Sequence, residues 1–277
     1  MAHHIPEPSF KTHPGRGQHF LIDDYYIQRI LDLAEVGPED EVIEIGPGFG
    51  ALTIPLSKRV SRIIAIESDR RLVKLLNDRF ARDVDRIKII QADVMHMDFV
   101  LLCKDLNRPP VVLGNLPYYL ATALVQRLLP LGKHLKRMVF MLQKEVAERI
   151  IAGSSTKSYG YLSLIVQYFA EADCLLDIPP TVFKPRPKVQ STVIRLNFRS
   201  EPPVRVVDER TLFRIISSGF MHRRKTLINA LKLDPTLVDL NIERVCQSVG
   251  LERNARAEAL TLEDFALLSN ALACENG

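Results

Sequence analysis

Segments with the pattern of strands alternate with segments that have the pattern of helices from residue 41 to residue 151, and this alternation constrains the fold more than any other feature. Short apolar runs predict strands at 41–45, 63–66, 87–90, 111–113 and 138–142. Apolar residues at helical spacing predict helices at 23–33, 52–58, 70–80, 121–129 and 144–151. Such alternation is typical of βαβ units around a parallel sheet. We therefore expect an α/β fold, in which ligands bind at the carboxyl ends of the strands.

The chain changes character near residue 200. Before that point the pattern predicts a helix at 161–169, and strands at 169–176 and 191–198 flank a proline-rich segment. Beyond it only helices are predicted, at 208–220, 226–231, 242–249 and 261–273. We place a domain boundary there, so that residues 1–200 form an α/β domain and residues 201–277 form a small all-helical domain.

A glycine-rich turn follows the first predicted strand and precedes a helix, where glycines let the backbone approach a ligand closely. It runs from Gly46 to Gly50, and Gly46 and Gly48 are its candidate ligand-binding positions. The spacing differs from the Gly-x-Gly-x-x-Gly of dinucleotide sites, so nothing in it demands a pyrophosphate. The tighter turn favours the amino-acid end of S-adenosylmethionine.

Acidic residues end the next two predicted strands. Glu67 is placed to accept hydrogen bonds from two ribose hydroxyls, and Asp93 to accept one from the adenine amino group of a cofactor. Either carboxylate could instead be a helix cap or a surface charge. A nicotinamide-dependent dehydrogenase is the nearest alternative, because an acidic residue after the second strand also binds the ribose of NAD.

The tetrapeptide Asn115-Leu116-Pro117-Tyr118 follows the fourth predicted strand and contributes three candidate catalytic residues, Asn115, Leu116 and Tyr118. The Asn115 oxygen and a nearby main-chain carbonyl could accept both hydrogens of an exocyclic amine, whose lone pair then points at an electrophile. Tyr118 offers a face for a nucleobase. The same residues also suit an ordinary β-turn. Their position downstream of a cofactor loop favours methyl transfer to an amino group.

The chain carries a formal net charge of +4. Two basic clusters are candidates for contact with RNA phosphates, or else are solvated surface; their cations are Lys184, Arg186 and Lys188 in one and Arg223, Arg224 and Lys225 in the other. The four cysteines are far apart and predict no metal site or disulfide framework. No run of eighteen apolar residues and no signal-peptide pattern occurs, so we expect a cytoplasmic protein.

Four motifs together resemble one family. They are Gly17–Leu21, Glu44–Thr53, Asn115–Tyr118 and Val182–Ser191, and they span most of the chain. In this order they resemble the bacterial small-subunit (16S) ribosomal RNA adenine dimethyltransferases of the KsgA type. The resemblance implies a Rossmann-like methyltransferase sheet with a small helical C-terminal domain that docks onto the ribosomal subunit. It also implies a monomer that uses S-adenosylmethionine and no metal.

The resemblance implies a role for each matching residue. Cofactor contacts fall on the N-terminal motif, the glycine turn and the ends of three strands, at Gln18, His19, Leu21, Gly46, Gly48, Glu67, Asp93 and Asn115. Tyr118 and Phe183 are expected to sandwich the target adenine. The implied targets are two adjacent adenosines in the terminal hairpin loop of 16S rRNA within the immature 30S subunit. His19 departs from the family's commoner Asn, so cofactor contact could depend on pH.

Two further interpretations stay open. The erythromycin-resistance methylases share the glycine turn and the Asn-x-Pro-Tyr type of motif but modify large-subunit rRNA. The segment from Phe183 to Ser191 favours the small-subunit type instead. A non-enzymatic assembly factor on the same fold is the second alternative, against which the intact acidic residues and Asn115 argue.

Overall fold

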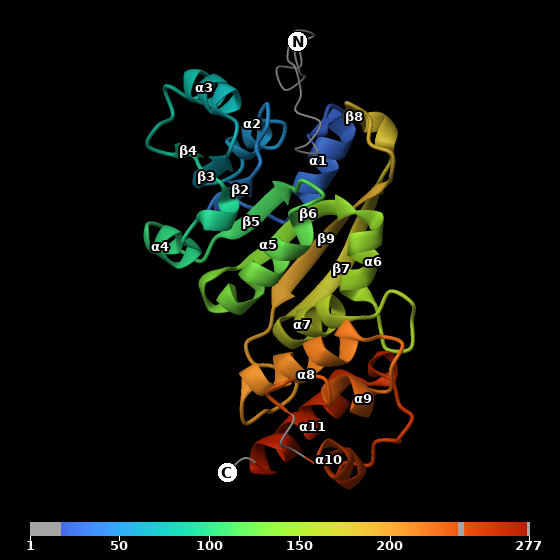
Figure 1. Cartoon of the computed structure of the whole chain (residues 1–277). Coiled ribbons are helices and arrows are strands. Elements are labelled where there is room, and N and C mark those ends of the chain that lie inside the picture. The colour runs from blue at the N-terminus through green and yellow to red at the C-terminus, as the bar shows by residue number, and fades with distance from the viewer. Residues whose placement is uncertain (1–17, 238–240, 276–277) are drawn as a thin grey trace. The chain divides into compact units, whose positions relative to one another are not determined.

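The computed structural model describes residues 18–237 and 241–275. The chain divides into two compact units, each formed by two stretches of sequence. The first, which we call the sheet unit, comprises Met1–Ala147 and Glu171–Phe198, and the second, the helical unit, comprises Glu148–Ala170 and Arg199–Gly277. Figure 1 shows the elements of both along the chain.

The sheet unit is built on a seven-stranded sheet with the order β4-β3-β2-β5-β6-β9-β7. The strands are β2 (Glu41–Ile45), β3 (Arg62–Glu67), β4 (Ile87–Gln91), β5 (Val111–Asn115), β6 (Arg137–Gln143), β7 (Ala170–Ile178) and β9 (Ser191–Phe198). Strands β2 to β6 pair in parallel, whereas β9 pairs antiparallel with β6. The α/β fold that the alternation predicts is therefore confirmed.

The central strands are buried along almost their whole length, because helices connect successive parallel strands. Val42, Ile63, Val111 and Val139 belong to one hydrophobic cluster of the sheet unit. The connecting helices are α2 (Thr53–Leu56), α3 (Arg70–Arg79), α4 (Phe99–Lys104) and α5 (Ala121–Leu128), whereas α1 (Asp24–Leu33) precedes β2 and α6 (Lys144–Ile151) follows β6. Helix α2 is shorter than expected, and α4 was not predicted.

The strand order reverses beside β2. The chain runs outward from β2 through β3 to β4 and then returns to place β5 on the other side of β2. Ligands of open α/β sheets bind at such a reversal. Gly46 follows β2 and Asn115 ends β5, so the fold places the glycine turn and the Asn-Leu-Pro-Tyr motif side by side.

A short pairing ties the N-terminal segment to a much later part of the chain. Strand β1 (Phe20–Leu21) pairs antiparallel with β8 (Phe183–Lys184), and the Ile22 amide donates to the Val182 carbonyl at 2.9 Å. In Figure 1, β8 lies near helix α1, which follows β1 in the chain. The pairing brings the segments around His19 and Pro185 to the same edge of the sheet unit.

The helical unit contains α7 (Tyr161–Phe169), α8 (Glu209–Met221), α9 (Leu227–Leu231), α10 (Ile242–Ser248) and α11 (Leu262–Glu275). It is larger than the sequence boundary at 200 indicates, because residues 148–170 pack with it. Tyr159 and Tyr168 are buried in its core, where their hydroxyls donate to the Leu260 carbonyl at 2.9 Å and to Glu209 at 2.8 Å. Helix α7 therefore supplies part of the helical core.

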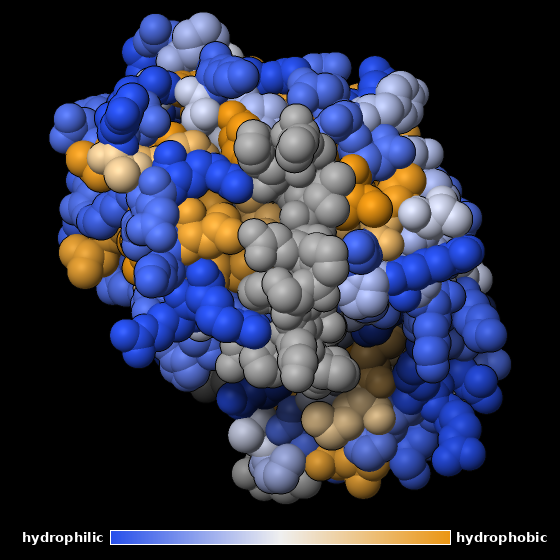
Figure 2. All heavy atoms as spheres, turned by 90° about the horizontal axis from the view of Figure 1, so that it is seen from above, coloured by the Kyte–Doolittle hydropathy of each residue, from blue (hydrophilic) through white to orange (hydrophobic). Residues whose placement is uncertain are grey.

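No helix within the described residues is both long and apolar enough to cross a bilayer. In the view from above, hydrophobic side chains show at the surface in several separate groups among hydrophilic ones (Figure 2). Among the exposed large hydrophobic residues of the sheet unit are Tyr25, Leu101 and Tyr119.

Candidate active site

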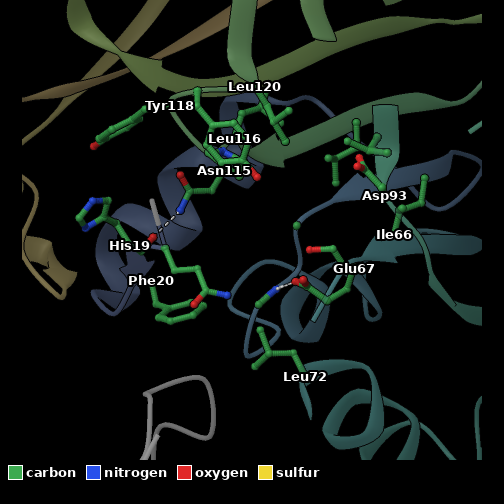
Figure 3. A pocket seen from close by; sticks show the side chains of 18 of the residues that line it. His19, Phe20, Ile66, Glu67, Leu72, Asp93, Asn115, Leu116, Tyr118 and Leu120 are labelled. Carbon is green, nitrogen blue, oxygen red and sulfur yellow. Dashed lines mark hydrogen bonds between the residues drawn. The ribbon is translucent and has the colours of Figure 1, made fainter. Parts of the chain in front are cut away.

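A cavity of about 260 Å³ opens at the carboxyl ends of β2 to β5 (Figure 3). Most of the residues that the sequence singles out line it. They are Gln18, His19, Gly46, Gly48, Glu67, Asp93, Asn115, Leu116 and Tyr118, joined by Phe20, Tyr119 and Leu120 among others.

The glycine turn has the left-handed backbone that favours glycine. The φ angles of Gly46, Gly48 and Gly50 are 68°, 59° and 86°. A Cβ atom at Gly48 would also lie 3.0 Å from the ring of Phe20, which is closer than side chains normally approach. The turn therefore keeps its backbone at the cavity wall only with glycine at Gly48.

Glu67 lies where the sequence predicts, at the end of β3, and supports the turn directly. Its carboxylate accepts from the Gly48 amide at 3.3 Å and from the Asp69 amide at 2.9 Å. Burial raises the pKa of this carboxyl above its ordinary value. A carboxylate accepts about four hydrogen bonds, so capacity for ligand hydroxyls remains.

Asp93 is a helix cap, which is one of the two predicted possibilities, and its contact with a cofactor adenine stays a prediction. It caps the short 3-10 helix Val94–His96 by accepting from the Met95 amide at 2.9 Å, and its carboxylate lies 3.4 Å from the His96 ring. It nevertheless lines the cavity and is about half exposed. The cap fixes the carboxylate at the rim, where it can still accept from a ligand.

The orientation of the Asn115 amide is fixed. Its Nδ2 donates to the His19 carbonyl at 2.8 Å, and because a carbonyl only accepts, the amide must present its NH₂ group there. Its oxygen then points away from His19 (Figure 3). The Asn115 oxygen, the predicted acceptor for an amine, is thus oriented by the main-chain carbonyl of His19, the residue before β1.

Tyr118 is held at its hydroxyl and on one face of its ring. The hydroxyl lies 3.4 Å from the Ser191 hydroxyl, and the ring stacks on His19 with 5.4 Å between centroids and 30° between planes. Burial raises the pKa of the phenol. Ser191 ends the Val182–Ser191 motif, and its contact with Tyr118 was not predicted.

Two predicted site residues, Leu21 and Phe183, lie outside the large cavity. They are 2% and 4% exposed and belong to the hydrophobic cluster of the sheet unit, because the pairing of β1 with β8 turns both inward. Leu21 lines a smaller cavity of about 30 Å³ next to Asn115. The predicted contact between Phe183 and an adenine stays a prediction.

Glu44 lies beneath the glycine turn and was not predicted as a site residue. It is 1% exposed, and its Oε2 has no hydrogen-bond partner among the described residues. It lines the smaller cavity together with Asn115. Burial raises the pKa of Glu44 to about 7, and the negative charge of Glu67 adds to the rise.

The basic residues fall into different environments. Lys184, Arg186 and Lys188 are exposed in the sheet unit. In the helical unit, the Arg223 guanidinium donates to the carbonyls of Lys157 and Tyr159 at 3.1 and 3.2 Å and lies 3.4 Å from Glu258. Arg223 thus holds the helical unit together, whereas Arg224 and Lys225 are exposed and make no side-chain bond with the described residues.

The sequence profile described as "Ribosomal RNA adenine dimethylase" matches residues 9–273. The chain belongs to this family. Curated proteins named "Ribosomal RNA small subunit methyltransferase A" are similar over nearly all of it. That of Bacillus cytotoxicus is 41% identical over 275 residues, covering 97% of this chain and 94% of the relative. That of Geobacillus kaustophilus is 42% identical over 271 residues, covering 96% and 92%.

Solved structures agree on the fold. A dimethyladenosine transferase from Plasmodium falciparum has a TM-score of 0.73 at 22% identity and covers 90% of this chain and 95% of its own. The 23S rRNA methyltransferase ErmE has a TM-score of 0.67 at 25% identity and covers 92% and 99%.

Family membership decides between the two cofactor classes that the sequence left open. The protein is an rRNA adenine dimethyltransferase that uses S-adenosylmethionine, not a dehydrogenase. The groups that line the cavity suit that cofactor. The left-handed glycine turn allows close approach of the backbone, and the buried carboxylate of Glu67 and the rim carboxylate of Asp93 can accept hydrogen bonds.

Proposed function

We propose that this protein methylates the exocyclic N6 amines of two adjacent adenosines in the 3′-terminal hairpin loop of 16S rRNA, each of them twice. The substrate is the rRNA within an immature small ribosomal subunit. The names of relatives that are 41% and 42% identical to the chain support a small-subunit target. The observation that carries the chemistry is the fixed Asn115 amide, which turns its oxygen away from the His19 carbonyl at the cavity wall.

The cofactor side of the cavity is assigned to the residues around the glycine turn. When bound, S-adenosylmethionine supplies an electrophilic methyl group. We assign the ribose hydroxyls to Glu67 and the cofactor adenine to Asp93. The main chain around Gly46, Gly48 and Asn115, together with the N-terminal segment of Gln18, His19 and Leu21, would complete the pocket.

Asn115 and the following turn act on the substrate amine. The Asn115 oxygen accepts one amine hydrogen, and the main-chain carbonyl of Leu116 accepts the other. The two acceptors orient the nitrogen lone pair, so rate enhancement comes from alignment. The methylated nitrogen is cationic and loses its proton to water, so no side chain is required as a general base.

The target adenine must leave its stack to reach this position. Tyr118 is ready to receive it, because Ser191 and His19 already fix the orientation of its ring. Stacking on such a ring is worth about 1–3 kcal/mol per base. Phe183 is the proposed second face on the strength of its motif, although its ring is buried beside Leu21.

Phosphate contacts are assigned to exposed cations. In the sheet unit these are Lys184, Arg186 and Lys188, and in the helical unit Arg224 and Lys225, with Arg223 supporting the local fold. Such contacts position the RNA without reading its sequence. The helical unit would in this way help dock the enzyme onto the subunit.

Mass mapping of rRNA tests the proposal. Undermethylated small subunits, large subunits and total rRNA are each incubated with the protein and labelled S-adenosylmethionine. The proposal expects N6,N6-dimethyladenosine at two neighbouring positions of 16S rRNA from small subunits, and no uptake by subunits already methylated. Label in 23S rRNA alone would indicate the erythromycin-resistance type, and subunit binding without any label would indicate an assembly factor.

A further inference from the structure

Within the described residues, His19 makes two hydrogen-bond contacts and one ring contact, all with groups on the substrate side of the cavity. Its carbonyl accepts from Asn115 Nδ2 at 2.8 Å, and its ring stacks on Tyr118 with 5.4 Å between centroids. Its Nδ1 lies 2.8 Å from the Pro185 carbonyl. In Figure 3 the imidazole lies next to the Tyr118 ring and points away from Glu67 and Asp93.

The contact with Pro185 determines that the Nδ1 atom of the imidazole carries a hydrogen. A carbonyl oxygen only accepts hydrogen bonds, so Nδ1 must carry a hydrogen. The ring is then held at one nitrogen by the segment after β8 and on one face by Tyr118. The side chain that the family resemblance assigns to the cofactor thus already contacts two other segments: the catalytic turn, through Tyr118, and the 183–191 segment, through Pro185.

We propose that the His19 side chain is a positioning residue for the target adenine, which joins Tyr118 to the Pro185 segment so that the stacking face is in place before RNA binds. This inference rests on the proposed function. Ser191 holds the Tyr118 hydroxyl from the end of the same segment, so His19 and Ser191 fix the ring at two points. Loss of His19 would leave the ring held only at its hydroxyl.

Three variants separate the two side-chain contacts. His19→Asn keeps a donor near the position of Nδ1 and lacks the ring, His19→Phe keeps a ring and lacks the donor, and His19→Ala lacks both. Asp93→Ala is the matched control, because Asp93 lines the same cavity but, among the described residues, bonds to Met95 and His96 and not to Tyr118 or Pro185. Thermal melting of each variant checks that it is folded.

Two measurements are made on each variant: the Kd for S-adenosylmethionine by calorimetry and the small-subunit concentration that half-saturates methylation. The His19 variants should bind the cofactor within about twofold of the unsubstituted protein, while His19→Ala needs about tenfold more subunits. This is the size expected of one aromatic contact plus one hydrogen bond. His19→Asn and His19→Phe should each recover part of the loss, and Asp93→Ala should mainly weaken cofactor binding.

A double-variant cycle tests whether His19 acts through Tyr118. In a Tyr118→Ala background, adding His19→Ala should change half-saturation less than threefold, because the group that it positions is gone. The inference would be overturned if His19→Ala raised the half-saturating subunit concentration by the same factor in the Tyr118→Ala background as in the unsubstituted protein. A cofactor Kd raised tenfold or more in His19→Ala with unchanged half-saturation would also overturn it, because His19 would then be a cofactor ligand.

Failure of the proposed function would look different, because the unsubstituted protein would then not methylate small subunits at all. In that case the contact between His19 and Tyr118 is tested without RNA, by NMR of the protein with isotope-labelled tyrosine rings. The resonances of Tyr118 should shift more in His19→Ala than in Asp93→Ala. Unchanged Tyr118 resonances would overturn the inference.

Discussion

Asn115 depends on the direction of its amide as much as on its presence. The hydrogen bond from Nδ2 to the His19 carbonyl is what leaves the oxygen available to an amine. A carboxylate of the same shape would place an acceptor against that carbonyl, and the repulsion would turn it away. Size and orientation can therefore be tested separately at this position.

We expect Asn115→Ala and Asn115→Asp both to lower kcat by roughly a hundredfold or more, the usual cost of removing one transition-state contact. Cofactor affinity should change only a few-fold, since neither Glu67 nor the glycine turn bonds to the Asn115 side chain. Single-turnover methylation of small subunits and calorimetry with the cofactor measure the two quantities. Dimethylation at a near-normal rate by either variant would refute the assigned role.

Glu44 carries a thermodynamic cost that depends on pH. Its pKa is raised from 4.5 to about 7 in the folded protein, so the folded state binds this proton more tightly than the unfolded state does. Well below pH 4.5 the group is protonated in both states and contributes nothing. As the pH rises from 4.5 to 7 the folded state loses stability, by about 3 kcal/mol at 1.36 kcal/mol per pKa unit.

Replacement of Glu44 by Gln removes that titration while keeping the shape. We expect the difference in free energy of unfolding between Glu44→Gln and the unsubstituted protein to shift in favour of Gln by about 3 kcal/mol between pH 4.5 and pH 7. Urea unfolding at several pH values measures it. A difference that stays constant with pH would show that Glu44 titrates normally.

At the scale of elements, the glycine turn between β2 and α2 joins the cofactor cavity to the sheet. Gly48 has a φ of 59°, and an added Cβ would meet the Phe20 ring at 3.0 Å. Phe20 belongs to β1, so a side chain at Gly48 would also disturb the N-terminal strand. The amide of Gly48 would then lose its bond to Glu67.

Gly48→Ala should therefore destabilise the protein by about 1–2 kcal/mol, the cost of a left-handed backbone at a non-glycine residue. It should also weaken cofactor binding by roughly tenfold, since each 1.4 kcal/mol is a factor of ten. Gly37→Ala is the control, because a Cβ there meets nothing within 4 Å and its φ is not left-handed. Thermal unfolding and calorimetry measure both. Equal effects at the two glycines would contradict the explanation.

Elements with long apolar runs could be predicted from the sequence, and short ones could not. Strand β2 and helix α7 begin and end where the pattern indicates, because each buries a nearly continuous run of several residues. The pairing of β1 with β8 involves two residues on each side and has no period. The same limit hid the contacts of Tyr118 with Ser191 and His19, since only the folded chain brings these residues together.

At the scale of the whole molecule, the two units do not divide the sequence at one point. Residues 148–170 belong to the helical unit, and the chain then returns to the sheet unit for β7 to β9. The Arg199 amide donates to the Phe169 carbonyl at 3.0 Å, so the end of the first stretch of the helical unit lies beside the start of the second. A short linker can therefore replace the intervening strands.

We expect residues 199–277 alone to fold poorly, because the buried Tyr159, Leu164 and Tyr168 would be missing from their core. Glu148–Ala170 joined to Arg199–Gly277 through about four glycine and serine residues should fold cooperatively. Circular dichroism and thermal melting compare the two proteins. If residues 199–277 alone melt cooperatively at the same temperature, α7 is not part of the helical core.

RNA docking can be tested with a charge-matched pair of double variants. Arg224→Ala with Lys225→Ala should weaken binding to small subunits and reduce the slope of log affinity against log salt by about 2, one for each lost phosphate contact. Lys232→Ala with Arg253→Ala removes the same charge elsewhere in the helical unit, where both residues pair with Glu243. Filter binding over a salt series measures both. If both double variants bind small subunits equally weakly, the net charge of the protein and not a contact at Arg224 and Lys225 explains the loss.

The pairing of β1 with β8 has a consequence for a chain that is still being synthesised. The glycine turn, Glu67, Asp93 and Asn115 all precede residue 120, whereas Pro185 and Ser191 emerge from the ribosome much later. A nascent chain can thus assemble most of its cofactor cavity while the Tyr118 ring still lacks both the Ser191 hydroxyl and a Pro185-anchored His19. We expect cofactor binding to mature before base recognition during translation.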